Sequence, residues 1–394
     1  MNRFLQECQK IYHNLILDPS HYRRVRVVLG NESCDLDSAI SALVYGYIIY
    51  HENKQKGVRN YEVLPLLNVA HDDFPLKTEV TFYLKLHGIS LDWVPTRGSR
   101  ISSSSKDQFS LSKLHKAGVL ELTLVDHHVL PPSDHELMSS VIEIIDHRPQ
   151  DSDWDWPNTD VTIKPVGSCC TLIAKKILER SPHLLTFQIC HLLYGPILLD
   201  TVSFSPEAGR TTDLDKQVIG SLERKISVDR NRLFQDLIFA KTQVSGLTDS
   251  QILRKDLKMI GGIPIAGLPM LVEEFSKRSN MEQTLVNFLK AKSDHNLMLL
   301  MGLRISGEII ERDLAVVSTV PATGDRLVEA LLKFDAPSLG LTEITNHNIR
   351  FLRLFKQSNI RMSRKQIAPI IQKVASLLKE LTKCPGTKLS SIST

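Results

Sequence analysis

Short apolar runs alternate with helix-like stretches through the first half of the chain. The strand-like runs are rich in β-branched and aliphatic residues and lie at 25–29, 61–69, 91–94, 120–125, 141–145 and 195–199. The helix-like stretches lie at 1–17, 39–49, 79–86, 110–118 and from 168 onward. Strands that alternate with helices predict a parallel sheet with crossover helices. The expected fold class is therefore α/β.

Acidic side chains recur where four of these apolar runs end. Asp35 and Asp37 follow the first run, Asp126 follows 120–125, Asp146 follows 141–145, and Asp200 follows 195–199. Ligands in open parallel sheets bind at the carboxyl ends of the strands, so we expect these carboxylates to lie together. Histidines stand beside two of them. Carboxylate with imidazole suits Mn²⁺, Mg²⁺, Co²⁺ or Zn²⁺ without selecting one, and the pattern predicts a shared metal centre.

The second half of the chain has a different pattern. Residues 213–240 are helical and charged, and a second unit is expected from Val244 onward. Its strand candidates are 263–266, 297–303 and 314–319, and its helix candidates are 249–259, 270–275, 281–291, 326–334 and a last helix after Met362. This mixture predicts a smaller mixed α/β domain. The Ser102–Ser105 run is expected to be a surface loop, and the tail 385–394 is expected to be flexible.

Composition narrows the class of protein. The net charge of +4 is small and evenly spread, which argues against a nucleic-acid-binding surface. No apolar run is long enough to span a bilayer, so no membrane partner is expected. The six cysteines lack metal-site spacing, which favours a reducing compartment. Residues 1–17 contain Glu7, so we expect a cytoplasmic protein, with a mitochondrial location as the alternative.

Eight short motifs, in order along nearly the whole chain, carry a resemblance to a known family. The strongest are Gly-Asn-Glu-Ser-Cys-Asp-Leu-Asp-Ser at 30–38, Leu-Val-Asp-His-His at 124–128 and Asp-His-Arg-Pro at 146–149. The others lie at 166–169, 199–200, 244–248, 253–256 and 363–365. With these motifs the chain resembles the DHH phosphoesterase superfamily and, within it, the Prune and exopolyphosphatase family.

The resemblance implies a domain plan. It predicts a DHH domain at 1–222, a helical linker at 223–243, a DHHA2 domain at 244–384 and the tail at 385–394, with the active site in the cleft between the two domains.

It also implies a set of site residues. Two divalent cations, Mg²⁺ or Mn²⁺ with Co²⁺ as an alternative, would activate a water for attack on phosphorus. Their ligands would be Asp35, Asp37, Asp126, His147 and Asp200, with Asp126 bridging both ions. His127 would assist proton transfer, and Arg148 would hold phosphate oxygens beside the reacting group. The expected substrate-binding residues are Asn31, Arg148, Lys258, Arg364 and Lys365.

Two positions depart from the pyrophosphatases of the same superfamily. Asn31 and Arg148 stand where those enzymes carry histidine. An amide is a poorer metal ligand than an imidazole, and a guanidinium cannot act as a proton donor at neutral pH. Both departures accompany the Prune and exopolyphosphatase pattern and argue against a dedicated pyrophosphatase.

Three functional hypotheses follow from the resemblance. The first is a metal-dependent exopolyphosphatase that cleaves short inorganic polyphosphates or nucleoside polyphosphates. The second is a cyclic-nucleotide phosphodiesterase that uses the same site. The third is an interaction protein with a weak site, which binds a partner such as a nucleoside diphosphate kinase. Clustered carboxylates repel one another without metal, which favours catalysis, whereas Asn31 keeps the third hypothesis open.

Overall fold

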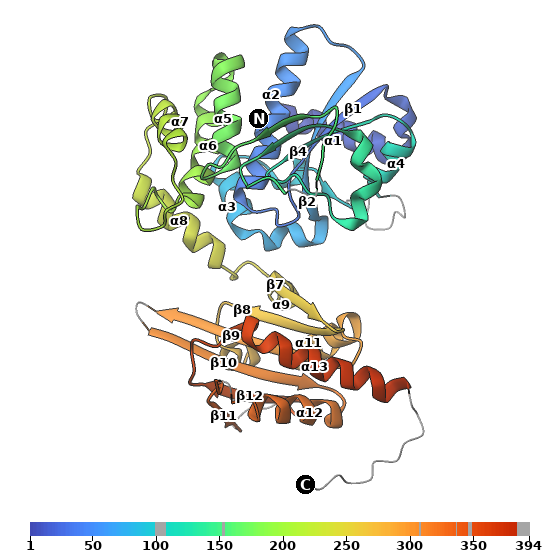
Figure 1. The fold of residues 1–394 in the computed structure, drawn as a ribbon, viewed down its shortest axis with the longest axis vertical. Coiled ribbons are helices and arrows are strands. Elements are labelled where there is room, and N and C mark those ends of the chain that lie inside the picture. The colour runs from blue at the N-terminus through green and yellow to red at the C-terminus, as the bar shows by residue number, and fades with distance from the viewer. Residues whose placement is uncertain (99–107, 152–153, 307–308, 336, 346–348, 384–394) are drawn as a thin grey trace. The chain divides into compact units, whose positions relative to one another are not determined.

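The computed structural model describes residues 1–98, 108–151, 154–306, 309–335, 337–345 and 349–383 (Figure 1). The predictions for Ser102–Ser105 and for the tail 385–394 lie outside these residues. The chain divides into two compact units, Met1–Gln243 and Val244–Thr394. Each unit has its own hydrophobic core, so each is described by itself. The expected placement of the active site between two domains stays a prediction.

The first unit is built on a six-stranded parallel sheet with strand order β3-β2-β1-β4-β5-β6 (Figure 1). Its strands are β1 Arg24–Leu29, β2 Tyr61–Ala70, β3 Thr96–Arg97, β4 Leu120–Val125, β5 Val141–Asp146 and β6 Asp160–Ile163. All of its neighbouring strands pair in parallel. The predicted α/β class is confirmed. The chain order also reverses at β1, where β2 lies on one side and β4 on the other, and ligands bind at such switch points.

Helices connect these strands and cover the sheet. They are α1 Asn2–Leu17, α2 Leu36–Gln55, α3 Thr78–Leu86, α4 Leu111–Lys116, α5 Cys169–Arg180, α6 Phe187–Asp200, α7 Asp213–Glu223 and α8 Arg230–Thr242. Helix α2 is buried over most of its length, because it packs against β2, α5 and α6. Its first turn therefore lies at the carboxyl end of β1 with little freedom to move.

Two of the predicted strands of this unit are wrong. Residues 195–199 belong to helix α6, and Asp200 is the last residue of that helix. Leu91–Trp93 forms a 3₁₀-helix, and the strand β3 follows it. Helix α6 is apolar on almost every side because it is surrounded by protein, so its sequence lacks the polar positions that reveal a helical period.

The second unit contains a mixed six-stranded sheet with the order β11-β12-β10-β9-β8-β7. Its strands are β7 Asp256–Ile260, β8 Ile263–Leu268, β9 Leu297–Ser306, β10 Ile309–Ser318, β11 Leu341–Ile344 and β12 Leu352–Gln357. Only β8 and β9 pair in parallel among the described strands. The helices are α9 Asp249–Lys255, α10 Val272–Ser276, α11 Met281–Lys292, α12 Pro321–Leu332 and α13 Arg364–Lys383, and α12 and α13 share one core with the sheet.

The predicted helix at 249–259 is too long. Helix α9 ends at Lys255, and Asp256 begins β7, so Lys258 lies on a strand. Gly261 and Gly262 join β7 to β8 with φ angles of +57° and +87°, which favour glycine. No described helix is long and apolar enough to cross a membrane.

Candidate active site

Asp126 lies directly beyond strand β4 in a left-handed backbone conformation. Its φ is +61°, and its N–H donates to the Ile145 carbonyl of β5 over 2.9 Å. A residue other than glycine pays about 1–2 kcal/mol for such a conformation, although aspartate tolerates it better than most. The carboxylate is almost completely buried at 1% exposure. The sheet therefore holds a strained, buried acid at its carboxyl edge.

Asp37 is fixed by the N-terminus of a helix distant in sequence. Both of its oxygens accept hydrogen bonds, from Ser168 Oγ at 2.7 Å and from the N–H groups of Cys169 and Cys170 at 2.6 and 2.8 Å. Asp37 thus satisfies free N–H groups in the first turn of α5, where a carboxylate is also favoured by the helix dipole. Ser168 is the N-cap residue of α5, but its hydroxyl binds Asp37 instead of its own helix.

Asp146 orients the two residues that follow it. His128 donates from Nδ1 to Asp146 Oδ2 over 2.6 Å, because its Nε2 accepts the N–H of Asp151 at 2.9 Å. Asp146 Oδ1 accepts the backbone N–H groups of His147 and Arg148 at 2.7 and 3.2 Å. The His147 ring then donates from Nδ1 to the Val166 carbonyl over 3.0 Å. This bond leaves Nε2 of His147 as the nitrogen available for a ligand.

Three of the five predicted metal ligands meet in one cluster. One ligand atom from each of Asp37, Asp126 and His147 lies within 4.8 Å of the others. His147 Nε2 is 3.2 Å from Asp126 Oδ1 and 3.8 Å from Asp37 Oδ2. Carboxylate and imidazole donors converging at this spacing fit a divalent transition metal or Mg²⁺.

Asp35 and Asp200 line the same cavity, which has a volume of about 530 Å³. Asp35 caps α2 by accepting the Ser38 N–H at 3.1 Å, and Asp200 ends α6. Asp200 Oδ2 is buried and has no hydrogen-bond partner among the described residues. An uncompensated buried carboxylate oxygen is costly, and a cation is the group that would satisfy it.

The pKa values show the strain of this acidic cluster without a cation. Burial and the neighbouring Asp37 charge raise the pKa of Asp126 to about 7. Burial, followed by the charges of Asp37 and Asp35, raises the pKa of Asp200 well above its usual range. Burial alone would lower the pKa of His147, but its hydrogen bond to Asp126 and the Asp37 charge raise it to about 10. Protons therefore occupy a site suited to a cation.

His127 and Asn31 are both buried, and they line a second cavity that shares Arg148 with the cavity of the cluster. Burial lowers the pKa of His127 to about 4, and its Nδ1 donates to the Val125 carbonyl at 2.9 Å. A ring neutral at pH 7 with its proton on Nδ1 can accept a proton at Nε2. The Asn31 amide donates to Asp126 Oδ2 at 2.7 Å, and its oxygen accepts from Ser33 and Cys34. Asn31 therefore positions Asp126, and its predicted contact with substrate stays a prediction.

Comparisons with known proteins identify the family of the chain. A family model described as the DHHA2 domain matches residues 235–374. The chain is 34% identical over 392 residues to exopolyphosphatase PRUNE1 of Bos taurus, covering 98% of this chain and 82% of that protein. It is also 34% identical to exopolyphosphatase PRUNE1 of Homo sapiens, over 92% of this chain and 78% of that protein. The chain belongs to the Prune family of DHH phosphoesterases.

A more distant relative of the Prune chain is named for its metal. A manganese-dependent inorganic pyrophosphatase of Methanothrix thermoacetophila is 26% identical over 174 residues, which cover 42% of this chain and 55% of that protein. In this chain, the cluster of Asp37, Asp126 and His147 offers donor atoms that could hold a metal ion.

The predicted phosphate-binding cations of this Prune chain fall into the two units. Arg148 lies in the first unit, 3.4 Å from Asp126 Oδ1. Lys258, Arg364 and Lys365 line one cavity of about 480 Å³ in the second unit, although Lys258 is more than 100 positions from the other two in sequence. Arg364 is held by the carbonyl and the carboxylate of Asp256 at 2.9 and 2.8 Å. Their contact with substrate stays a prediction.

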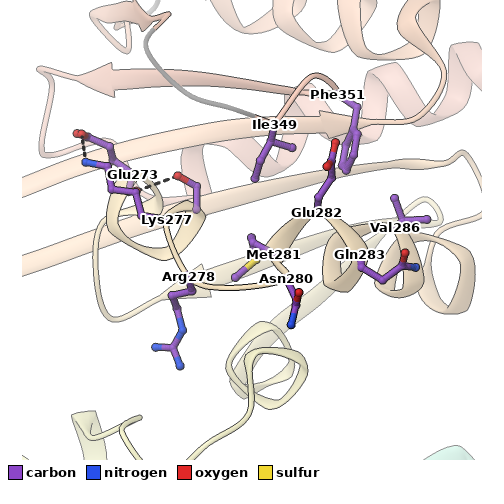
Figure 2. A pocket seen from close by; sticks show the side chains of 11 residues that line it. Glu273, Lys277, Arg278, Asn280, Met281, Glu282, Gln283, Val286, Ile349 and Phe351 are labelled. Carbon is purple, nitrogen blue, oxygen red and sulfur yellow. Dashed lines mark hydrogen bonds and ion pairs between the residues drawn. The ribbon is translucent and has the colours of Figure 1, made fainter.

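A second cavity of the DHHA2 unit, of about 800 Å³, contains none of the predicted residues (Figure 2). Figure 2 shows that both charged side chains and apolar ones, among them Ile349 and Phe351, line this cavity. Lys277 pairs with Glu273 at 2.7 Å, and Arg278 pairs with Asp249 at 2.6 Å. Because these two cations are neutralised within the protein, this cavity offers little for a phosphate.

The sequence analysis missed several residues that build the first-unit site. His128 and Ser168 hold Asp146 and Asp37, as described above. Arg210 and Thr211 line the metal cavity, and Asp215 lies beneath them. The Thr212 to Asp215 spacing is a capping-box pattern that identifies the start of α7. Nothing in that local pattern shows that Asp215 also reaches Gly167.

Proposed function

We propose that this Prune-family chain is a metal-dependent phosphohydrolase that cleaves phosphoanhydride bonds of short inorganic polyphosphates. The observation that carries the proposal is the convergence of Asp37, Asp126 and His147, with the unsatisfied Asp200 oxygen in the same cavity. The mammalian relatives are named exopolyphosphatases, which supports a phosphoanhydride as the bond that is cleaved. The acids and the imidazole would be committed as metal ligands, which leaves none of them to attack phosphorus, so water is the nucleophile in this proposal.

Asp35, Asp37, Asp126, His147 and Asp200 would hold two divalent cations, Mg²⁺ or Mn²⁺. When bound, such cations supply Lewis acidity toward phosphate oxygens and lower the pKa of a water molecule. His147 can serve as a ligand only when its Nε2 is unprotonated, so loading the site displaces its proton. Asn31 keeps Asp126 oriented throughout, because its amide bonds both the side chain and the carbonyl of Asp126.

Arg148 and His127 have separate tasks in this proposal. Once cations occupy the carboxylates, the Arg148 guanidinium is released from its 3.4 Å contact with Asp126 and can bind phosphate oxygens in a bidentate manner. His127 is a buried proton acceptor beside Asp126, and its unpartnered Nε2 can take a proton from a donor that enters with the substrate. Neither residue needs to change its backbone position.

The test measures phosphate release from tripolyphosphate, pyrophosphate and cyclic AMP in parallel, with Mg²⁺ or Mn²⁺. An Asp200→Ala variant is the control, because it removes a predicted ligand. Metal-dependent hydrolysis of tripolyphosphate that is lost in the variant supports the proposal. Turnover of cyclic AMP alone would favour the phosphodiesterase hypothesis. Failure to hydrolyse any of the three would overturn the proposal and favour a protein that acts through partners such as a nucleoside diphosphate kinase.

A further inference from the structure

The loop from Gly209 to Thr212 contributes to the metal cavity from outside the sequence motifs. Helix α6 ends at Asp200, and the next turn contains three residues in the left-handed region, Val202, Ser203 and Phe204, with φ of +52°, +55° and +63°. A left-handed conformation is costly for a β-branched residue such as Val202. It persists only where the surrounding structure holds the backbone in place. The path brings residues 209–212 back to the cavity that Asp200 lines.

A buried carboxylate ties this loop to the turn that holds Asp37. Asp215 is fully buried, and its Oδ2 accepts the N–H of Gly167 at 2.9 Å and the N–H and hydroxyl of Thr212 at 2.7 Å each. Its Oδ1 accepts the Thr171 hydroxyl at 2.6 Å. Gly167 has to be glycine here, because a Cβ would lie 2.5 Å from Thr201 and 3.0 Å from the Arg210 carbonyl. The loop is therefore as firmly placed as the metal ligands.

Arg210 is the cation on this loop, and no described residue neutralises its charge. Among the described residues it has no ion-pair partner, whereas Arg148, the other arginine that lines the cavity, pairs with Asp126. Thr211 Oγ, next in the chain, is buried without a hydrogen-bond partner among the described residues. A free guanidinium beside a donor hydroxyl suits an anion with several oxygens.

The carboxylates of the cavity do not explain why Arg210 is there. Four aspartates line the cavity, and two divalent cations would balance their charge. A loaded site therefore has no need of Arg210 for its own neutrality, yet it must still attract a highly charged phosphate chain. An unpaired arginine at its wall supplies that attraction and, unlike lysine, can bind two phosphate oxygens at once.

We propose that Arg210, assisted by the Thr211 hydroxyl, binds a phosphate group of the substrate from within the first unit. This assignment rests on the proposed function and adds a phosphate-binding residue that the DHH motifs do not contain. Asp215 is a positioning residue for this loop, because it acts through Thr212 and Gly167 and lies beneath the cavity wall.

The test compares Arg210→Gln and Arg210→Lys in the full chain with Lys216→Gln as a matched control. Lys216 lies on α7 close in sequence, is exposed and pairs with Asp213, and it does not line the cavity. Two quantities are measured on metal-saturated protein: the KM for tripolyphosphate and the dissociation constant for inorganic phosphate by calorimetry. The Mn²⁺ affinity is measured separately for each variant.

We expect Arg210→Gln to raise both the KM and the phosphate dissociation constant by about 10- to 100-fold, the loss typical of a charged hydrogen-bonding partner. Arg210→Lys should recover part of this loss, while Lys216→Gln behaves as wild type and Mn²⁺ affinity stays constant in all three. Equal behaviour of Arg210→Gln and Lys216→Gln would overturn the assignment. Loss of Mn²⁺ binding in Arg210→Gln would also overturn it, since the residue would then support the metal site.

The proposal can fail independently of the proposed function. If the wild-type protein hydrolyses none of the phosphate substrates, the calorimetric titration with inorganic phosphate still decides the role of Arg210. Thr211→Val gives a second measure, because it removes the hydroxyl and keeps the side-chain shape. We expect it to weaken phosphate binding several-fold, and unchanged binding would remove Thr211 from the assignment.

Discussion

Asp126 combines an unfavourable backbone conformation with an unfavourable environment for its charge. Its φ is +61°, its carboxylate is buried, and Asp37 lies beside it. Hydrogen bonds from Asn31 and contacts with His147 and Arg148 offset part of this cost. A divalent cation would offset the rest, which is why this residue links the fold to metal binding.

The protons on this cluster predict how metal binding depends on pH. The pKa of Asp126 is raised to about 7 and that of His147 to about 10, so both groups hold protons in the metal-free protein at pH 6. A cation must displace these protons, so metal affinity rises with pH. We expect the apparent dissociation constant for Mn²⁺ to fall at least about 100-fold between pH 6 and pH 8, since one displaced proton changes it tenfold per pH unit. Calorimetry at several pH values measures it, and a constant affinity would contradict the prediction.

The same raised pKa values predict how the stability of the metal-free protein changes with pH. Asp126 binds its proton more tightly in the folded state, so its contribution is present at low pH and is lost as the pH rises from the ordinary aspartate range through about 7. His147 has a raised folded pKa as well, so its contribution is full below its ordinary pKa of 6.5 and is lost as the pH rises through about 10. Both terms weaken the metal-free protein toward alkaline pH.

Asp215→Asn tests the buried carboxylate beneath the cavity wall. In the variant an amide nitrogen would replace one carboxylate oxygen that now accepts hydrogen bonds. The NH₂ group would then face the donors of Gly167, Thr171 or Thr212 in a buried site. We expect a loss of about 2–4 kcal/mol in the free energy of unfolding, measured by urea denaturation. Asp213→Asn is the control, because Asp213 is 92% exposed two positions earlier in the same helix. It should change stability by no more than about 0.5 kcal/mol. Equal effects of the two changes would show that the bonds of Asp215 contribute little.

At the scale of elements, helix α6 places Asp200 by close contact with α3. Gly195 of α6 donates its N–H to the Tyr83 hydroxyl at 3.0 Å, and the same hydroxyl donates to the His191 carbonyl. A Cβ at Gly195 would lie 2.3 Å from the Tyr83 ring, which is fully buried and cannot move aside. The position of Asp200 therefore depends on the absence of a side chain five residues earlier.

Gly195→Ala should destabilise the first unit, and Gly220→Ala should not. Overpacking at Gly195 is expected to reduce the free energy of unfolding by about 1–3 kcal/mol and to weaken Mn²⁺ binding through Asp200. At Gly220, in helix α7, a Cβ meets no atom within 4 Å, so alanine should stabilise by up to about 1 kcal/mol. Urea denaturation of both variants measures the difference. If the Gly195 variant were as stable as wild type, the α3–α6 contact would be looser than described.

At the scale of the whole molecule, the five candidate metal ligands all belong to the first unit. They lie between residues 35 and 200, whereas the second unit begins at Val244. Each unit has a separate core, so the chain need not unfold in one step. A cation that binds the folded first unit stabilises it by RT ln(1 + c/Kd), where c is the free metal concentration, so the gain grows with the logarithm of that concentration.

Hydrogen exchange resolved by peptide tests this division. At Mn²⁺ concentrations about 100 times the dissociation constant, the first unit should gain about 2.7 kcal/mol of protection. The gain is expected in peptides from β1 and β4, and peptides from β8 to β10 should exchange as without metal. Asp126→Ala serves as the control and should abolish the gain. Equal protection of both units would show that they unfold together.

The sequence by itself determined those strands of the parallel sheet that show a local pattern of apolar residues. Runs such as 120–125 and 141–145 are apolar, β-branched and followed by acids, and both became strands with those acids at one edge. The carboxyl ends of parallel strands lie at the same edge of the sheet. The order of the strands therefore brought Asp37, Asp126 and His147 together. This part of the site could be predicted from spacing and motif.

Only the tertiary structure decided the remaining parts. Residues 195–199 read as a strand because they begin with Gly195-Pro196 and lack polar positions, yet burial on all sides made them part of α6. Arg210 carries no motif, and Asp215 carries only the local capping-box pattern. Arg210 reached the cavity because a left-handed turn and four hydrogen bonds to Asp215 fixed its loop. Contacts between residues far apart in sequence leave no periodic pattern along the chain. The roles of these residues can therefore be recognised only in the folded structure.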